Sequence, residues 1–436
     1  MKELFLIKDT LANKISYYHL MLFLFSLPFD RFYSHLILIS FGAHTLIQIR
    51  KSTIKPVFTM QTMVLQSVFF VTLISTIYSL NTLQAYREWE LYIPVLIFPL
   101  LFCFNALDLK KYRPQLLLAF ALCCTVTIIY LYINALATIG YYKMPLFAIL
   151  SPAFTNHNFS EPIDMHATFF SLQIAIALVY LLFRLINEKV ASNKIVYGIC
   201  CLILAAGIVQ LSSKSVFFAL FLIVNVAFPY FLLQGIQRKR FMIISASFTA
   251  LVIVGIFNSR AFHDRFLGEL REDLSSSFAG QTVEPRLERW KVAASLIAQS
   301  PVIGYGAGSE IKVLKEKYFE KKFYRSFLSR LNAHNEYLSF LLKSGIWGLA
   351  AYLATLGYGF KKAVSNKDIL FFSFMLLLAV VSLSENILDA DKGVMFYSFF
   401  FSFFVFVSDQ KVNIQVPIKR HKYLRKVATN RMVVPS

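Results

Sequence analysis

Two arginines near the middle of this sequence have a spacing that suits phosphate binding. Arg286 and Arg289 are three residues apart, so they share one face of a predicted helix, and Trp290 is expected to stack above Arg286. Guanidinium groups bind phosphate oxygens through paired hydrogen bonds, which makes a phosphate or diphosphate the expected ligand. The alternative is that the arginines form ion pairs with the neighbouring acids Glu284 and Glu288.

Two further ionisable side chains lie where long apolar segments begin. His334 is a candidate general base, because histidine exchanges protons near neutral pH; the alternative is a histidine capped by backbone groups. Lys214 separates two apolar segments and is a candidate cation for a lipid-linked phosphate; the alternative is an ordinary lysine whose amine reaches the membrane surface. Ionisable groups at such a boundary are costly unless they are used or paired.

Two acidic stretches raise the alternative of a bound metal. Residues 156–168 contain two histidines and two carboxylates, but their spacing fits no common structural zinc site. Asp389 and Asp391 form an Asp-x-Asp pair of the kind that often binds a divalent metal in sugar transferases, although Lys392 could simply neutralise Asp391. Neither pattern is complete, so the sequence predicts no metal and no cofactor.

The composition is typical of a membrane protein, so membrane helices are expected to position these residues. Hydrophobic residues make up 57% of the 436 residues and charged residues 16%, where a soluble domain has about 25% charged. This composition excludes a disordered chain and an ordinary soluble enzyme, and it argues against a nucleic-acid partner for the net charge of +20. Residues 1–15 are of mixed polarity and no small-residue cleavage site follows the first apolar stretch, which argues against a cleavable signal peptide.

Twelve apolar segments are predicted to be membrane-spanning helices, because a backbone inside a bilayer must satisfy its own hydrogen bonds. The segments lie at about 16–29, 34–49, 60–79, 91–106, 115–139, 165–187, 195–211, 215–234, 241–257, 335–359, 369–386 and 393–408. Lys and Arg cluster in every second loop and at both ends of the chain, which places both termini on the cytoplasmic side. Most of the net positive charge therefore lies in the predicted cytoplasmic segments, where Lys and Arg are attracted to anionic lipid headgroups.

The predicted organisation has four parts. Residues 1–257 form nine membrane helices, 258–334 a large outer loop, 335–408 three more membrane helices, and 409–436 a basic cytoplasmic tail. An outer loop as long as 258–334 is usually functional. The glycine run within it, at 304, 306 and 308, follows no predicted strand and so indicates a tight turn rather than a dinucleotide-binding loop.

The motifs of residues 284–350 resemble those of the O-antigen ligase family of bacterial membrane glycosyltransferases, which is related to the O-antigen polymerases. They are Arg286-x-x-x-Trp290, then Pro301-x-x-Gly304-x-Gly306-x-Gly308, then His334-Asn335-Glu336-Tyr337-Leu338 with Gly345 and Gly348. Weaker similarities are His166-Ala167-Thr168 and Glu385-Asn386-Ile387-Leu388 with Lys392-Gly393.

The resemblance implies an all-α integral membrane fold of the C-type glycosyltransferase kind with a large helical periplasmic loop. It implies metal-independent, inverting transfer of a glycan from undecaprenyl diphosphate to a hydroxyl of lipid A–core, at the periplasmic face of the bacterial inner membrane. The partners would be that lipid-linked donor, a lipid A–core or other glycan acceptor, and membrane lipids.

The resemblance also assigns roles. Arg286 matches the family arginine and His334 the family histidine, and both are predicted to be catalytic. Lys214 stands where the family has an arginine, which keeps the charge and loses the bidentate geometry. Glu336 and Glu385 are candidates to orient His334 or to bind sugar. The residues predicted to bind substrate are Lys214, Arg289, Trp290, Asn335, Glu336, Tyr337, His166, Glu385 and, in an outer loop, Arg87.

Several functions remain open. A polymerase that joins repeat units would use the same donor site, and so would a ligase that transfers glycan to protein hydroxyls. A transporter or flippase would be expected to show broken helices, charges at the bilayer midplane and often an internal repeat. Here the polar clusters lie at the outer edge, which favours the enzymes.

Overall fold

The computed structural model describes residues 2–49, 54–258, 260–273 and 284–409, and every regular element in these ranges is a helix. The predicted basic tail beyond 409, and residues 259 and 274–283 of the predicted outer loop, lie outside the described residues. In chain order the elements are α1 (Lys2–Phe5), α2 (Leu11–Ser26), α3 (Arg31–Ile47), α4 (Met60–Thr76), α5 (Thr82–Leu91), α6 (Ile93–Phe104), α7 (Leu109–Tyr141), η1 (Leu146–Leu150), η2 (Pro152–Phe154), α8 (His157–Ser160), η3 (Glu161–Ile163), α9 (Ala167–Asn187), α10 (Ala191–Leu211), α11 (Lys214–Leu222), η4 (Ile223–Ala227), α12 (Phe228–Leu232), α13 (Gly235–Asn258), α14 (Arg260–His263), η5 (Asp264–Gly268), α15 (Glu269–Asp273), α16 (Arg286–Ile297), α17 (Glu310–Glu320), α18 (Tyr324–Leu328), α19 (Glu336–Ser365), α20 (Ile369–Val381), η6 (Ile387–Asp389) and α21 (Asp391–Asp409).

Helices long and apolar enough to cross a membrane confirm the prediction of an all-α membrane protein. Six such stretches occur in the described chain: Leu109–Tyr141, Ala167–Asn187, Ala191–Leu211, Lys214–Leu232, Glu336–Ser365 and Asp391–Ser408. Met60–Thr76 and Ile369–Val381 are apolar but shorter. Helices α2, α3, α6 and α13 lie at the other predicted segments, so the count of twelve spans stays a prediction.

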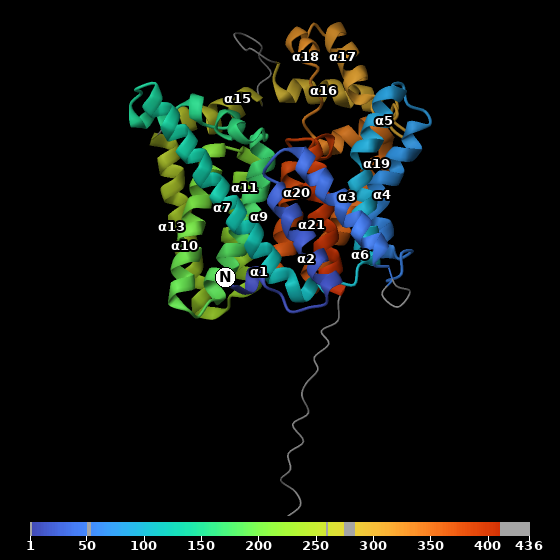
Figure 1. The fold of residues 1–436 in the computed structure, drawn as a ribbon. Helices are drawn as coiled ribbons and strands as arrows, with labels where there is room; N and C mark the ends of the chain where they lie inside the picture. The colour runs from blue at the N-terminus through green and yellow to red at the C-terminus, as the bar shows by residue number, and fades with distance from the viewer. Residues whose placement is uncertain (1, 50–53, 259, 274–283, 410–436) are drawn as a thin grey trace, which may run out of the picture.

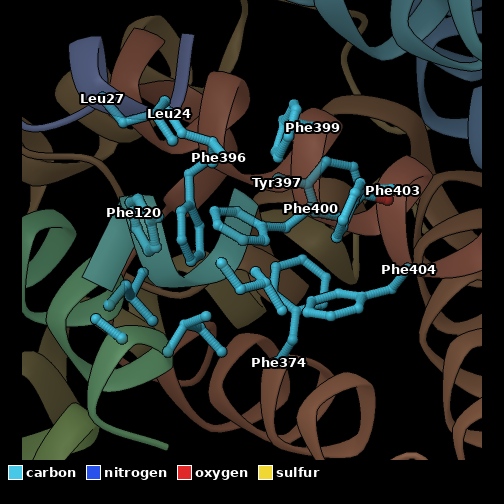
Figure 2. Close-up of a cluster of buried hydrophobic side chains, with 14 of the residues drawn as sticks. Leu24, Leu27, Phe120, Phe374, Phe396, Tyr397, Phe399, Phe400, Phe403 and Phe404 are labelled. Carbon is cyan, nitrogen blue, oxygen red and sulfur yellow. The ribbon is translucent and has the colours of Figure 1, made fainter. Parts of the chain in front are cut away.

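Helix α21 forms the centre of the bundle. Its apolar side chains point in every direction, as expected of a helix with neighbours all round. Figure 2 shows Phe400 and Phe404 among rings and leucines from other helices. The ring of Phe400 lies 5.1 Å from that of Phe120 on α7, and the ring of Phe404 lies 5.6 Å from that of Phe374 on α20. This aromatic core holds the helices that carry the polar residues.

A small helical cap lies at one end of the bundle. Helices α16, α17 and α18 stand at the end opposite the N-terminus (Figure 1). Their buried side chains, among them Val292, Leu296 and Leu314, pack with Leu342 at the outer end of α19. The cap is therefore seated on α19 through a hydrophobic core of its own.

Helix α19 is broken at Gly345, and the glycine run fills the break. Gly345 has φ +60° and ψ −151°, a conformation that glycine adopts without a steric penalty. The carbonyls of Leu342 and Lys343 accept hydrogen bonds, both of 2.8 Å, from the backbone N–H groups of Tyr305 and Gly306. The segment predicted only as a turn is thus a docked strap that satisfies backbone groups freed by the break.

The same strap joins α19 to α4 and α5. Ala307 donates its N–H to the Ser75 carbonyl at 3.2 Å, and the Gly308 N–H donates to the Glu88 carboxylate. At Gly306, which has φ +90°, a side-chain carbon would stand 2.3 Å from Cα of Ser79. Glycine is required here because two backbones come into direct contact.

Candidate functional site

His334 stands in the connection between the cap and α19, in a backbone conformation that few residues other than glycine adopt. Its φ is +47°, and its N–H donates to the Asn332 side-chain oxygen at 3.1 Å. Such a conformation persists only where the surroundings enforce it, and it is common at functional sites. The next residue, Asn335, caps α19 by accepting from the N–H of Leu338 at 3.1 Å.

One carboxylate connects the predicted base to the predicted phosphate-binding arginine. Glu385 Oε2 lies 3.4 Å from His334 Nδ1, and Glu385 Oε1 lies 3.9 Å from Arg286 Nη2. Arg286 is the first residue of α16, and its Nη1 donates to the Ser384 carbonyl at 2.9 Å. Helix α20 ends at Val381, short of the predicted boundary, so Glu385 lies in a loop that brings it to both partners.

Electrostatics favour the ionised form of Glu385. Its side chain is only 16% exposed. Burial alone would raise the pKa of this carboxyl, but the hydrogen bond and charge of His334, together with the charge of Arg286, hold the pKa below its ordinary value. Glu385 is therefore an anion between two cationic or potentially cationic groups.

Lys214 joins the same cluster through α15. Its Nζ lies 3.3 Å from Glu269 Oε2 and 3.8 Å from Asp273 Oδ2, and Arg286 Nε lies 3.4 Å from the same Asp273 oxygen. Opposite charges thus alternate from Lys214 through Asp273, Arg286 and Glu385 to His334. The carboxylates of α15 therefore balance the charges of both cations.

Arg289 and Trp290 stabilise the cap and are not part of the series of alternating charges from Lys214 to His334. Arg289 is 4% exposed, and its Nε donates to the Glu284 carbonyl at 3.2 Å. The Trp290 indole donates to the Ala333 carbonyl at 2.8 Å, directly before His334. Within the described residues no cation–π contact joins Trp290 to Arg286, so the predicted stacking does not occur. Sequence spacing placed the two arginines on one face, but the packing of α16 turns Arg289 inward.

The alternative, ion pairs of these arginines with Glu284 and Glu288, does not occur among the described salt bridges, because both acids have other partners. The Glu284 carboxylate accepts from the backbone of Arg325 at 3.2 Å and from that of Ser326 at 2.9 Å, and Glu288 pairs with Lys291 at 2.6 Å. These two acids therefore stabilise the cap and leave Arg286 to Asp273 and Glu385.

Glu336 and Tyr337 hold the start of α19 in place. Glu336 is fully buried, and its Oε2 accepts from the Leu388 N–H at 2.9 Å, while Oε1 has no hydrogen-bond partner in the described part of the chain. The Tyr337 hydroxyl donates to the Ala379 carbonyl at 2.8 Å. The structure thus gives both side chains contacts to neighbouring backbone.

His166 lies at the N-cap of α9, beside a second histidine. Its ring centroid is 4.2 Å from that of His157. Burial, helped by the charge of His157, lowers the pKa of His166 to about 4 against the opposing charge of Glu385, so this ring is neutral at neutral pH. Burial, helped by the charge of Arg265, lowers the pKa of His157, so that ring is neutral at neutral pH. His166 therefore borders the cluster from the side of α9, as the motif comparison suggested.

Arg87 is exposed on α5 and no contact joins it to His334 or Arg286 among the described side chains. Its neighbour Glu88 is 6% exposed and reaches inward to Lys343. The inward-facing member of this pair is therefore the carboxylate, since successive helical positions point to different sides.

A buried charge cluster beneath His334 was not anticipated from the sequence. Lys343 of α19, 6% exposed, pairs with Glu88, lies 2.5 Å from Asp389 Oδ1 and 3.6 Å from Glu310 Oε2. We call Lys343 with Glu88, Glu310 and Asp389 the Lys343 cluster. The available signal was a lysine inside an apolar helix, which is costly unless paired.

The Lys343 cluster holds the backbone on both sides of His334. Glu310 Oε1 accepts from the Ala333 N–H at 2.8 Å, and Asn386, which donates to Asp389 at 2.7 Å, accepts from the Asn335 N–H at 2.7 Å. Burial raises the pKa of the Glu310 carboxyl, against the opposing charge of Lys343. The cluster is thus the support that enforces the backbone turn at His334.

The acidic stretches do not converge as a metal site. Asp389 pairs with Lys343, whereas Asp391 Oδ2 lies 3.2 Å from His35 Nε2. No group of three or more His, Cys, Asp or Glu side chains suited to a metal occurs among the residues searched, which are those described. The two aspartates of the Asp-x-Asp pair therefore serve different neighbours.

The fold and site together define a helical membrane protein with a polar cluster at one end of the bundle, under a small helical cap. Residues 199–353 match the O-antigen ligase family model, which supports the family that the motifs resemble. The match includes Lys214, Arg286 and His334, and at a coarse level it supports a glycosyl-transfer enzyme of the ligase and polymerase type. A search of curated proteins finds no match to the chain.

Proposed function

We propose that this protein transfers a glycan from undecaprenyl diphosphate to a hydroxyl of a lipid A–core acceptor at the periplasmic face of the bacterial inner membrane. The observation that carries the proposal is the shared carboxylate of Glu385, which lies between His334 and Arg286 at 3.4 and 3.9 Å. This arrangement puts a base and a diphosphate-binding cation on either side of one anchoring group.

The proposed topology has twelve membrane spans, both termini in the cytoplasm, and the fold class of C-type glycosyltransferases. Residues 1–257 and 335–408 would form the membrane part, 258–334 the periplasmic loop and 409–436 a cytoplasmic tail. Supporting this division, α16–α18 and the N-terminus lie at opposite ends of the bundle, and Lys and Arg cluster in alternate loops.

In the proposed mechanism Arg286 and Lys214 bind the diphosphate. A ligand carrying two or more negative charges would compete with Asp273 and Glu269 for these cations. Charge develops on the diphosphate as the bond to the anomeric carbon breaks, and fixed cations lower the barrier by stabilising it. Arg289 and Trp290 support the site indirectly by fixing the cap.

His334 is the proposed general base. With Nδ1 facing Glu385, its Nε2 is left to accept the proton of the acceptor hydroxyl. The hydroxyl oxygen then forms a bond to the anomeric carbon, the electron pair of the breaking bond goes to the diphosphate, and the proton stays on His334. A single displacement of this kind inverts the anomeric configuration. Each step is supplied by side chains, so no metal is needed.

The deciding experiment is lipopolysaccharide profiling of a deletion strain complemented with wild type, His334→Ala or Arg286→Ala. A ligase predicts loss of the whole O-antigen ladder from lipid A–core, with carrier-linked glycan accumulating. A polymerase instead predicts that a single repeat stays attached. Full activity of both variants would refute the site assignment. EDTA treatment of the purified enzyme tests independence of a divalent metal.

A further inference from the structure

A polar pocket of about 230 Å³ lies beside the candidate site, between the starts of α3, α9 and α21. His166 is part of its wall, and it lies close enough to Glu385 and His334 to interact with both electrostatically. Arg286 and Lys214 approach Glu385 from α16 and α11, while the pocket approaches from α9 and α21. His166 is predicted to bind substrate, but the mechanism proposed above uses no other residue of this pocket.

Side chains of the pocket have hydrogen-bonding capacity that the protein leaves unfilled. Asp391 Oδ1 is buried and has no hydrogen-bond partner among the residues that the structure describes, while Oδ2 lies 3.2 Å from His35 Nε2. Among the described residues, the hydrogen bonds of the Lys392 amine are long, 3.4 Å to Ser34 Oγ and 3.5 Å to the Ser26 carbonyl. In the described part of the chain no carboxylate oxygen lies within 4.0 Å of that amine, and buried polar groups are normally satisfied.

The charges of the pocket argue for an uncharged polar ligand. The lining carries three carboxylates, those of Asp30, Asp164 and Asp391, and two cations, Arg31 and Lys392. The resulting net negative charge disfavours a phosphate or an acidic sugar. The cations stand among the carboxylates, and no metal-binding group of side chains is found in the ranges that the structure describes.

The remaining wall suits the apolar face of a sugar ring. Phe169 lines the pocket, with its ring 5.0 Å from the ring of His166, and Met165 and Ala390 are further apolar neighbours. A sugar residue offers hydroxyls that both donate and accept around its edge, and C–H groups on its faces. Asp391 can accept from one hydroxyl, Lys392 can donate to another, and Phe169 can pack against a face.

We propose that this pocket binds one neutral sugar residue of the substrate, through Asp391 and Lys392 with Phe169 against the ring. The proposal rests on the proposed function, because it names a sugar-binding subsite of the same reaction. The sugar belongs either to the glycan on the carrier or to the accepting glycan, and its chemistry is the same in both cases.

The test measures binding by full-length protein in lipid nanodiscs, so that it does not depend on turnover. The probes are bare undecaprenyl diphosphate, an undecaprenyl-diphosphate-linked oligosaccharide and purified lipid A–core. The variants are Asp391→Asn, which keeps the shape of the side chain, and Lys392→Gln. The matched control is Glu161→Gln, an exposed carboxylate one turn before Asp164.

Both pocket variants are expected to weaken binding of one glycan probe by about ten-fold, the effect of losing a hydrogen bond to a charged group. Affinity for bare undecaprenyl diphosphate should be unchanged, and the control should match wild type. A loss for the carrier-linked oligosaccharide assigns the sugar to the donor, and a loss for lipid A–core assigns it to the acceptor.

Unchanged affinity for both glycans in both variants would overturn the pocket assignment. So would an equal loss for the bare carrier, because that would indicate a general disturbance of the protein. Failure of the proposed function gives a different result: wild type would then not bind bare undecaprenyl diphosphate, and Arg286→Ala would change nothing.

Discussion

The aromatic core around α21 and the Lys343 cluster at the outer end of α19 are both buried, but they use opposite chemistry. In the core, rings such as Phe400 and Phe120 pack at 5.1 Å with no charge to satisfy. In the Lys343 cluster, several carboxylates surround one amine, and each remaining oxygen bonds to the backbone or to an amide. The first region sets where helices lie, and the second sets the conformation of one short connection.

The difference shows why a membrane protein would keep a costly charge cluster. Apolar packing tolerates small shifts, because dispersion contacts have little directionality. Hydrogen bonds to Glu310 and Asn386 fix the N–H groups of Ala333 and Asn335, and so they enforce the φ of +47° at His334. If this is correct, changes in the core should alter stability alone, and changes near His334 should alter activity.

The largest effect on activity is expected from His334→Ala. Loss of a general base typically lowers the rate by 10² to 10⁴-fold, so transfer should fall by about 10³-fold. Because the side chain is 29% exposed and its hydrogen bond among the described residues is the one to Glu385, the melting temperature should stay near that of wild type. Transfer assays and thermal unfolding on the same preparation check both parts; a stability loss matching the activity loss would contradict the catalytic role.

Lys343→Met is expected to remove both stability and activity. Breaking a buried ion pair from one side costs about 3–5 kcal/mol, because the carboxylates are left without their counter-charge. The second variant, Lys343→Met with Asp389→Asn, removes one of these carboxylates and should recover part of the loss. Lys361→Met, at an exposed position of the same helix, is the control. Equal unfolding free energies for the single variant and wild type would refute the role of the cluster.

Phe400→Ala should act on stability alone. Removing a buried ring leaves a cavity and typically costs about 3–5 kcal/mol, while the kcat of the molecules that remain folded should be unchanged. Phe400→Leu fills part of the space and should cost less. Denaturant unfolding together with active-site titration measures the two quantities; a fall in kcat with full folding would show that the core and the site are coupled.

A pH effect is expected from Glu385. Its pKa is held below the ordinary value of 4.5 by His334 and Arg286, so its contacts stabilise the fold fully above about pH 4.5 and lose this effect as the pH falls through the lowered pKa. The difference in melting temperature between wild type and Glu385→Gln should therefore be largest near neutral pH and shrink under acid conditions. A difference that grows toward low pH would contradict this account.

The smallest effect is expected from Asp273→Asn. Its carboxylate pairs with Arg286 at 3.4 Å and with Lys214 at 3.8 Å, and partly exposed pairs are worth about 0.2–1 kcal/mol. Without this competitor the KM for the lipid-linked donor should fall by about two- to five-fold, with kcat little changed. Glu272→Gln, on the same short helix, serves as the control. A rise in KM would show that Asp273 helps to bind the donor.

The sequence alone predicted the class of protein and the main polar residues. Apolar segments of bilayer length must become helices because their backbones have no other hydrogen-bond partners, and six such helices are present in the described chain. The motifs around Arg286 and His334 resemble the O-antigen ligase family, whose model matches residues 199–353. These features are local, since each depends on residues close together in the chain.

Only the tertiary structure decided which polar groups meet. Glu385 and His334 are 51 residues apart in the sequence, and Lys343 and Glu88 lie on different helices. The spacing of residues along the chain does not predict contacts between positions so far apart. The inward turn of Arg289, the separate partners of Asp389 and Asp391, and the docking of the glycine run on the broken α19 have the same origin. Helical periodicity gives the face on which a side chain lies, but the packing of whole helices determines what that face meets.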